Sequence, residues 1–234
     1  MNNDFVELPI KRGFNSISKL WEFCAENDLF ICGGYARYCC SPVSNPKPVS
    51  DVDLYPKSVK IFEKSFDVLQ EKGFEVIKEN DLSYTFNEKN SPIPSPLPIQ
   101  LIKPFQEARI LTYGSIEEIL NNFDFTVTRC TIISPEKVIV DKDFEKDEKS
   151  NHLIFKNIHC PISSLFRAFK YMKKGYWLNP LESIKLFQDW DNRDQEYKKS
   201  IFNFLEKTET FKKTGKETLT EKEIFELERL MMID

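Results

Sequence analysis

Histidine is almost absent from this sequence and glycine is scarce, since the 234 residues include 2 His and 7 Gly. With His152 and His159 alone, catalysis by histidine has few candidates. No apolar run approaches the roughly 18 residues that cross a bilayer, and the first residues lack the apolar stretch of a secretory signal. These absences predict a cytoplasmic protein without a membrane partner.

Several sequence motifs are also missing. There is no G-x-x-x-x-G-K-[ST] for a P-loop, no G-x-G-x-x-G for a dinucleotide fold and no G-x-S-x-G for a hydrolase. The 6 cysteines include no C-x₂-C pair, and Cys39 and Cys40 are adjacent. This spacing excludes the usual zinc modules, so we expect reduced, buried thiols and no structural zinc.

The composition is that of a folded protein with an uneven charge distribution. Hydrophobic residues make up 41% and aromatic residues 13% of the chain, which is enough for a core. The net charge of −4 argues against a broad basic coat for nucleic acid. However, the sequence has no acidic residue from Ser150 to Leu181. This shift predicts two parts, a head over residues 1–150 and a helical, locally basic part over residues 151–234.

Hydrophobic periodicity and turn residues predict mixed α and β structure in the head. The expected strands cover residues 29–32, 51–55, 74–78, 83–86, 99–102 and 125–132. The expected helices cover residues 16–27, 33–40, 59–72 and 116–121, and after the head 161–174, 181–190, 194–206 and 220–232. The predicted fold class is α+β, with a small mixed sheet flanked by helices and followed by a helical C-terminal part.

The most informative segment begins with two adjacent glycines between an expected strand and an expected helix. Gly33 and Gly34 have no Cβ, so a ligand can approach the backbone closely. The first N–H groups of the following helix can face an anion. The pattern indicates a phosphate site, although many α/β proteins place glycines at such turns.

Three aspartates follow the glycine pair. Asp51 and Asp53 alternate along an expected strand, so both carboxylates project from one face. Such oxygen pairs suit Mg²⁺ when substrate phosphates complete the site. Asp124 begins another strand-like run and is a candidate third ligand, because two-metal phosphoryl transfer uses a further carboxylate. The alternatives are a solvated edge strand for the first two and a turn residue for Asp124, with Asp141 or Asp143 as other third ligands.

Together these motifs resemble the nucleotidyltransferase fold of the DNA polymerase beta superfamily. The form Gly33-Gly34-x-x-Arg37 is closest to the head domain of poly(A) polymerases and CCA-adding tRNA nucleotidyltransferases. The resemblance covers about residues 28–135. It departs from the family in the long, proline-rich interval before Asp51 and in the missing basic residue after Arg37. By this resemblance, Gly33 and Gly34 hold the triphosphate, Arg37 contacts phosphate or acceptor, and the catalytic metal ligands are Asp51, Asp53 and Asp124.

The basic part contains a segment with two candidate faces at helical spacing. Leu165, Phe169 and Met172 form one apolar set, which predicts the buried face. Arg167, Lys170, Tyr171 and Lys174 form the other set, which predicts an exposed face that binds nucleotide or RNA. The alternative is an ordinary solvated basic face.

The leading hypothesis is therefore a Mg²⁺-dependent nucleotidyltransferase, with Mn²⁺ as an alternative metal. It would bind an NTP, ATP or CTP, and transfer the nucleoside monophosphate to an acceptor hydroxyl, foremost an RNA 3′ end. Two alternatives stay open. One is nucleotidylation of a protein or small molecule, as in toxins and antibiotic-modifying enzymes. The other is a binding or structural protein that keeps the fold without catalysis.

Overall fold

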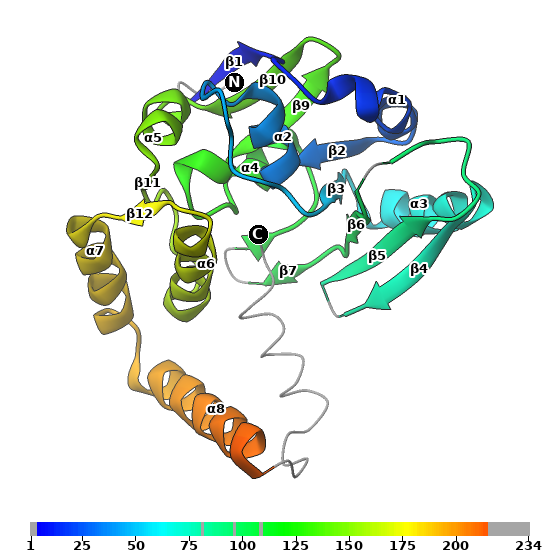
Figure 1. Ribbon diagram of the computed structural model, residues 1–234. Coiled ribbons are helices and arrows are strands. Elements are labelled where there is room, and N and C mark those ends of the chain that lie inside the picture. Colours follow the sequence, from blue (N-terminus) through cyan, green and yellow to red (C-terminus); the bar gives the residue numbers. More distant parts are fainter. Residues whose placement is uncertain (1–3, 81, 96, 108–109, 215–234) are drawn as a thin grey trace.

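The protein is a mixed α+β structure built around one large sheet (Figure 1). The computed structural model describes residues 4–214 except 81, 96, 108 and 109. The sheet has eight strands, which lie side by side in the order β1 (Phe5–Pro9), β10 (Lys137–Asp141), β9 (Cys130–Ser134), β2 (Leu29–Cys32), β3 (Val52–Pro56), β6 (Ile99–Ile102), β5 (Ser83–Glu88) and β4 (Phe74–Glu79). The pair β3–β6 is parallel, and the other neighbours are antiparallel.

Helices cover the sheet and continue beyond it. Within the described residues these are α1 (Ser18–Glu26), α2 (Gly33–Cys40), α3 (Val59–Glu71), α4 (Ile116–Leu120), α5 (Phe144–Ser150), α6 (Pro161–Lys173), α7 (Pro180–Asp191) and α8 (Gln195–Thr214). Two small sheets pair β7 (Gln106–Glu107) with β8 (Ile110–Leu111) and β11 (His152–Leu153) with β12 (Trp177–Leu178). None of these helices, within the part of the chain that is described, is long and apolar enough to span a bilayer.

The two faces of the sheet are packed differently because successive strand side chains alternate between them. The larger core joins strand residues such as Ile31 and Leu54 with apolar side chains of α1, α2 and α3. A smaller core on the other face joins Cys32 and Tyr55 with α4 and with Phe123. Cys32 and Asp53, which are register partners, thus point toward the smaller core.

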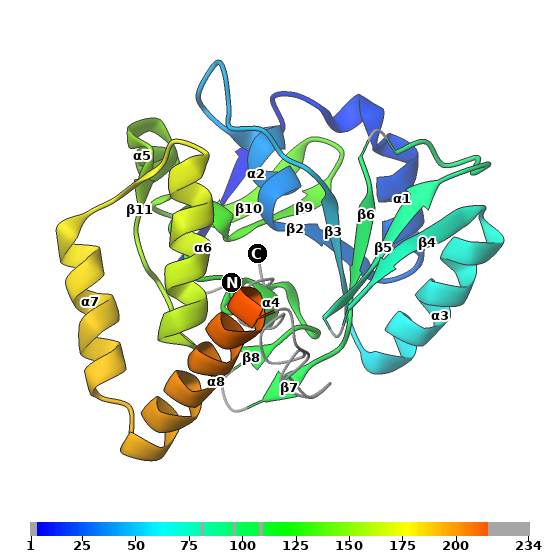
Figure 2. The same cartoon turned by 60° about the horizontal axis from the view of Figure 1, so that its bottom comes forward.

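The helices α6, α7 and α8 lie together at one end of the molecule, away from β4 and α3 (Figures 1 and 2). A third core joins α6 and α7 to the segment after α4: Phe125 and Val127 pack with Ala168 and Tyr171 of α6 and Leu186 of α7. Residues on both sides of the proposed boundary at Ser150 therefore share one core. The division into residues 1–150 and 151–234 stays a prediction.

The predicted fold class is confirmed, and most predicted elements appear within two residues of their expected bounds. Helix α1 begins at Ser18, two residues after its expected start, because Ser16 lies in a short 3-10 turn and its hydroxyl donates to the carbonyl of Gly13. One predicted strand is wrong. The expected strand 125–132 contains a 3-10 turn over Thr126–Thr128, and β9 begins only at Cys130. The expected helix 220–232 lies outside the described residues. The sequence patterns missed β1, β10 and α5.

Candidate functional site

The glycine pair forms the turn between β2 and α2. Gly33 has φ +68°, a backbone conformation that favours glycine. A Cβ on Gly33 would lie 3.2 Å from the Phe123 ring and 3.4 Å from Oδ2 of Asp53. Cys32, the N-cap residue, makes no side-chain hydrogen bond to the first turn of α2. The start of α2 therefore brings helix N–H groups and a carboxylate close together at a point without side-chain bulk.

Asp51 and Asp53 are linked through the neighbouring strand. Asp53 is 4% exposed and pairs in register with Cys32 on β2 and Gln100 on β6. Nε2 of Gln100 donates to Oδ2 of Asp51 at 3.2 Å, and the Ser50 hydroxyl donates to the same oxygen at 3.0 Å. Since Asp53 and Gln100 share a register position and Gln100 contacts Asp51, the two carboxylates lie on one side of the sheet.

Cys32 is a neutral neighbour of Asp53. Its Sγ donates to the Thr131 hydroxyl at 3.4 Å, and burial raises the pKa of the Cys32 thiol to about 12. A thiol with this pKa is protonated at neutral pH. The cysteine at this position therefore contributes packing, and the carboxylates supply the negative charge.

Asp124 is held by a different partner. Its carboxylate Oδ2 accepts from Nε of Arg167 on α6, and both side chains are buried. The backbone carbonyl of Asp124 also accepts from the N–H of Lys156 at 2.8 Å. The other carboxylate oxygen, Oδ1, is buried and has no hydrogen-bond partner among the described residues, and Asp124 lines a small hollow together with Phe123, Thr128 and Tyr171. Asp124 thus ties the segment after α4 to the helical part.

This geometry pairs Asp124 with a cation, and the assignment of Asp124 as the third metal ligand stays a prediction. Across the described residues, no group of three acidic, histidine or cysteine side chains is arranged to hold a metal ion. Asp51 and Asp53 alone fit a divalent cation of the kind that uses one or two carboxylates and completes its shell with substrate phosphates. The charge of Asp124 is paired with that of Arg167.

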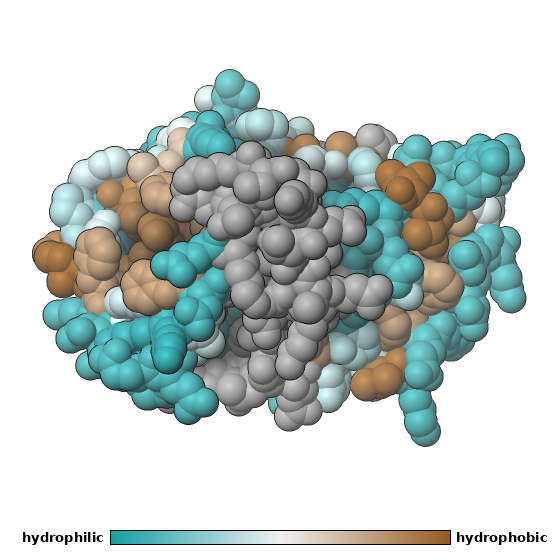
Figure 3. All heavy atoms as spheres, turned by 90° about the horizontal axis from the view of Figure 1, so that it is seen from below, coloured by the Kyte–Doolittle hydropathy of each residue, from teal (hydrophilic) through white to brown (hydrophobic). Residues whose placement is uncertain are grey.

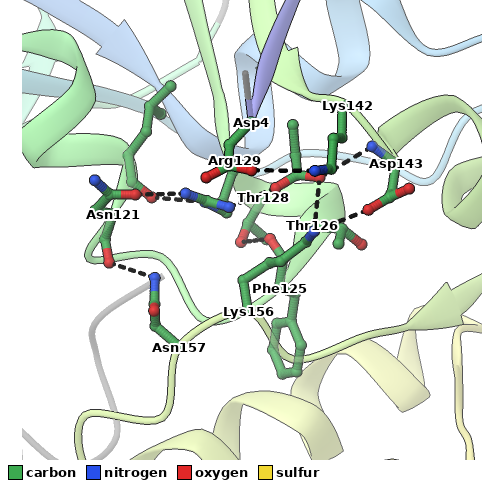
Figure 4. A network of polar contacts seen from close by, with 12 residues as sticks. Asp4, Asn121, Phe125, Thr126, Thr128, Arg129, Lys142, Asp143, Lys156 and Asn157 are labelled. Atoms are coloured by element: carbon green, nitrogen blue, oxygen red, sulfur yellow. Dashed lines mark hydrogen bonds and ion pairs between the residues drawn. The ribbon is translucent and has the colours of Figure 1, made fainter. Parts of the chain in front are cut away.

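The other two candidate third ligands also belong to ion pairs. Oδ2 of Asp141 accepts from Arg129, and Oδ1 lies 3.4 Å from Nζ of Lys156. Lys156 also donates to Asp143 at 2.8 Å, which holds the pKa of the Asp143 carboxyl below its usual value. Figure 4 shows Arg129 reaching Asn121 in the same network. These contacts fix the segment that carries Asp124, and they use both carboxylates.

Arg37 makes structural contacts in the described residues, and its predicted contact with phosphate or acceptor stays a prediction. It is 1% exposed, and its Nη1 donates to Glu148 of α5 and to the Tyr176 hydroxyl, both at 3.1 Å. Its Nη2 donates to the backbone carbonyl of Lys47 at 2.9 Å. Burial raises the pKa of Tyr176, so the phenol stays neutral and donates to Glu148. Arg37 therefore holds α2, α5 and the proline-rich loop together.

Each of the two predicted faces of α6 is divided in the structure, since Leu165 packs against the third core and Lys170 is exposed, as predicted, while other members are placed differently. Tyr171 is 2% exposed, and its ring lies 5.7 Å from that of Phe125, so it cannot stack on a base as predicted. Arg167 is buried with Asp124, which removes it from the predicted nucleotide-binding face. Phe169 and Met172, which were expected in the core, are 48% and 40% exposed, at the end of the molecule where Figure 3 shows apolar side chains gathered on the left. Of the three nucleotide-binding residues predicted on this helix, Lys170 alone is exposed.

Sequence patterns missed two residues that border the site, Gln100 and Phe123, and one exposed aromatic residue of α6, Phe166. Gln100 lies in a short strand, and the sequence does not show which strand pairs with it. Phe123 directly precedes Asp124, but nothing in the sequence indicates that its ring packs on Gly33. Phe166, which is 36% exposed, belongs to neither predicted face. The available signal for Phe166 was its spacing of i, i+3, i+4 and i+7 with Phe169, Lys170 and Lys173.

Comparisons with known proteins agree with this fold. A sequence profile of the Gabija anti-defense 2 family protein matches residues 7–150. A search of curated proteins found no match. A crystal structure of a tRNA nucleotidyltransferase complexed with a primer tRNA and an incoming ATP analog is 18% identical, with TM-score 0.50, and covers 73% of this chain and 49% of that one. A tRNA-processing enzyme, apo form I, is 18% identical, with TM-score 0.53, and covers 78% and 49%.

The chain spans about half the length of these solved structures. At 18% identity, they establish the fold alone. The chain thus has a nucleotidyltransferase-like fold, and the activities of the longer enzymes do not transfer to it without further argument.

Proposed function

The chain belongs to the Gabija anti-defense 2 family, and on this premise we propose that it is a nucleotidyltransferase that moves a nucleoside monophosphate from an NTP to an acceptor hydroxyl. The observation that carries the proposal is the turn at Gly33, where the start of α2 and the Asp53 carboxylate lie together at a position without a Cβ. The glycine pair and the acidic strand resemble the heads of poly(A) polymerases and CCA-adding enzymes.

The backbone N–H groups at Gly33 and Gly34 bind the triphosphate in this proposal, because helix N-termini favour anions. Asp51 and Asp53 would hold Mg²⁺, or Mn²⁺ in its place, together with the phosphate oxygens. A divalent cation bound there supplies charge neutralisation for the phosphates. Gln100 orients Asp51, and the ring of Phe123 shields the inner side of the Gly33 turn.

The leading acceptor is the hydroxyl at an RNA 3′ end. The support is a fold shared with a tRNA nucleotidyltransferase that was solved with a primer tRNA and an ATP analog. Because that complex contains an ATP analog, we expect ATP rather than CTP as the nucleotide of this chain. The basic, acid-free stretch from Ser150 to Leu181 supplies positive charge for such an acceptor.

A protein or small-molecule acceptor is the second candidate. The family description names an anti-defense role against Gabija. A protein can counter a defence system by covalently modifying one of its proteins. The net charge of −4 also fits an acceptor that is not a long nucleic acid. In either case the transfer chemistry at Gly33 and Asp53 is the same, and the acceptor decides the biological effect.

The test is transfer of label from each of the four α-³²P-labelled NTPs, with Mg²⁺ or Mn²⁺, to mixed RNA or to added protein. We expect label on RNA that is lost with EDTA and with Asp53→Asn. Asp67→Asn, an exposed acid on α3, is the matched control and keeps activity. Label on protein supports the second acceptor. Equal transfer by Asp53→Asn and the wild type, or no transfer to any acceptor, would refute the proposed enzyme and favour a binding protein.

A further inference from the structure

Gln100, on β6, lies beside both carboxylates of the proposed cation site. Strands β3 and β6 run parallel and side by side (Figure 2), and Gln100 pairs in register with Asp53. Register partners on neighbouring strands direct their side chains to the same face of the sheet. The Nε2 atom of Gln100 also donates to Oδ2 of Asp51 at 3.2 Å. One amide group therefore contacts the first aspartate from a position beside the second.

Asp51 depends on such a contact more than Asp53 does. Asp53 lies within β3 and is 4% exposed, so the strand and its neighbours fix its side chain. Asp51 precedes β3, which begins at Val52, and is half-buried. Its Oδ2 accepts from Gln100 and, at 3.0 Å, from the Ser50 hydroxyl. Neither donor carries a charge, so these two hydrogen bonds orient the carboxylate without neutralising it.

The residue type at position 100 determines how many carboxylates meet here. Glutamine and glutamate have nearly the same size and shape, but glutamate would add a third negative charge beside the two aspartates. The number of charged ligands is a main control on the affinity of oxygen sites for divalent cations. In the described part of the chain, acidic, histidine and cysteine side chains form no group of three that could hold a metal ion. The neutral amide of Gln100 is therefore a low-charge alternative to a site with three carboxylates.

We propose that Gln100 is a positioning residue that sets the cation affinity of the site, because it holds Asp51 beside Asp53 and adds no charge. With two carboxylates, the site binds a bare divalent cation weakly. It binds the cation tightly together with a nucleoside triphosphate, whose phosphates supply further oxygens and charge. Cation binding is thereby coupled to the arrival of the nucleotide. The inference rests on the proposed function, because it concerns the cation site that the proposed transfer uses.

The experiment is calorimetry with the full chain, in which Mn²⁺ is titrated alone and a non-hydrolysable ATP analog is titrated with and without Mn²⁺. We expect the wild type to bind the analog about tenfold more tightly with Mn²⁺ than without it. Gln100→Glu should bind Mn²⁺ alone about tenfold more tightly than the wild type, because a third carboxylate is present. Gln100→Leu should weaken analog binding in Mn²⁺ about tenfold, because Asp51 loses a hydrogen bond. Gln70→Glu, an exposed position on α3, is the matched control and should resemble the wild type.

Thermal unfolding separates this role from ordinary packing. In EDTA, Gln100→Glu should unfold at a lower temperature than the wild type, because three carboxylates repel one another. Saturating Mn²⁺ should raise the unfolding temperature of Gln100→Glu more than that of the wild type, since the cation binds the folded state. If Gln100→Glu folds in Mn²⁺ alone and not in EDTA, that result supports the inference in the same way. An equal loss of stability with and without Mn²⁺ would mean that Gln100 only packs.

The inference is overturned if Gln100→Glu binds Mn²⁺ no more tightly than the wild type, or if Gln70→Glu gains as much. It is also overturned if Gln100→Leu binds the analog as the wild type does, or if Mn²⁺ does not tighten analog binding by the wild type. Its failure and that of the proposed function are distinguishable. The expected affinities without any label transfer refute the proposed function alone, whereas label transfer with an unchanged cation affinity in Gln100→Glu refutes the inference alone.

Discussion

Asp53 and Asp124 are buried to nearly the same extent, with 4% and 3% of their surface exposed, yet their surroundings are opposite. Asp53 lies beside the start of a helix, a neutral thiol and a glycine turn. Asp124 lies against the guanidinium of Arg167. The difference teaches that burial of a carboxylate does not reveal its role. The neighbouring groups are more informative: the guanidinium of Arg167 makes Asp124 part of the framework, whereas Asp53 lies beside a helix start whose N–H groups can bind an anion.

The largest expected effect comes from breaking the framework pair. Arg167→Met leaves a buried Asp124 carboxylate without its cation, so we expect the free energy of unfolding to fall by about 3–5 kcal/mol in urea titrations. The double variant Asp124→Asn/Arg167→Met should recover part of this loss, since neither charge is then left alone. Lys137→Met, which breaks an exposed pair with Glu7, is the control and should leave the free energy of unfolding close to that of the wild type. If Arg167→Met lowers the free energy of unfolding no more than Lys137→Met does, the ion pair with Asp124 does not stabilise the fold.

The next effect concerns the turn beside Asp53. Gly33→Ala forces a side chain into a left-handed conformation and against the Phe123 ring, so we expect a loss of about 2 kcal/mol. Gly34→Ala is the matched control: its nearest contact would be an ordinary 3.6 Å to Val49, and its stability should change by less than about 1 kcal/mol. Thermal unfolding compares the two. Equal losses would mean that the turn at Gly33 has no special geometry.

Neutralising the other carboxylate should affect chemistry more than stability. Asp53→Asn keeps the shape of the side chain, and we expect the free energy of unfolding to change by less than about 1 kcal/mol. Nucleotide transfer should fall about 100-fold or more, because the charge that faces the phosphates is lost. Urea titration and label transfer on the same preparation measure both. If Asp53→Asn destabilises the protein as much as Asp124→Asn does, the contrast between the two aspartates disappears.

Sequence patterns predicted the turn between β2 and α2 and the strand β3 better than they predicted which residues of α6 face the core. Local signals sufficed for Gly33, Gly34 and the strand after Asp51, because a strand–glycine–helix turn and an alternating strand depend on neighbouring residues. For Asp124 the deciding partner is 43 positions away, and a distant cation leaves no local pattern.

A distant partner also explains why Arg167 of α6 is buried while Phe169 is exposed. Helical spacing identifies two sets of residues but cannot say which set faces the core when both contain aromatic side chains. Apolar content favoured burial of Phe169, yet the buried ion pair of Arg167 fixes the rotation of the helix. Arg37 follows the same rule: its motif position indicated a ligand contact, while its partner Glu148 lies far along the chain.

The smallest effect should come from a carboxylate whose ion pair is exposed. Lys156 lowers the pKa of Asp143, so this pair stabilises the fold above the unfolded pKa of about 3.9 and stops doing so as pH falls through the lower folded value. Asp143 is 43% exposed, and solvent screening should keep the contribution below about 0.5 kcal/mol. Unfolding free energies of the wild type and Asp143→Asn, measured from pH 7 to pH 3, should differ slightly at pH 7 and converge at pH 3. A difference that grows toward pH 3 would contradict the assigned partner. Together with Arg167→Met, this result would show that the same kind of ion pair matters to the fold only where water is excluded from it.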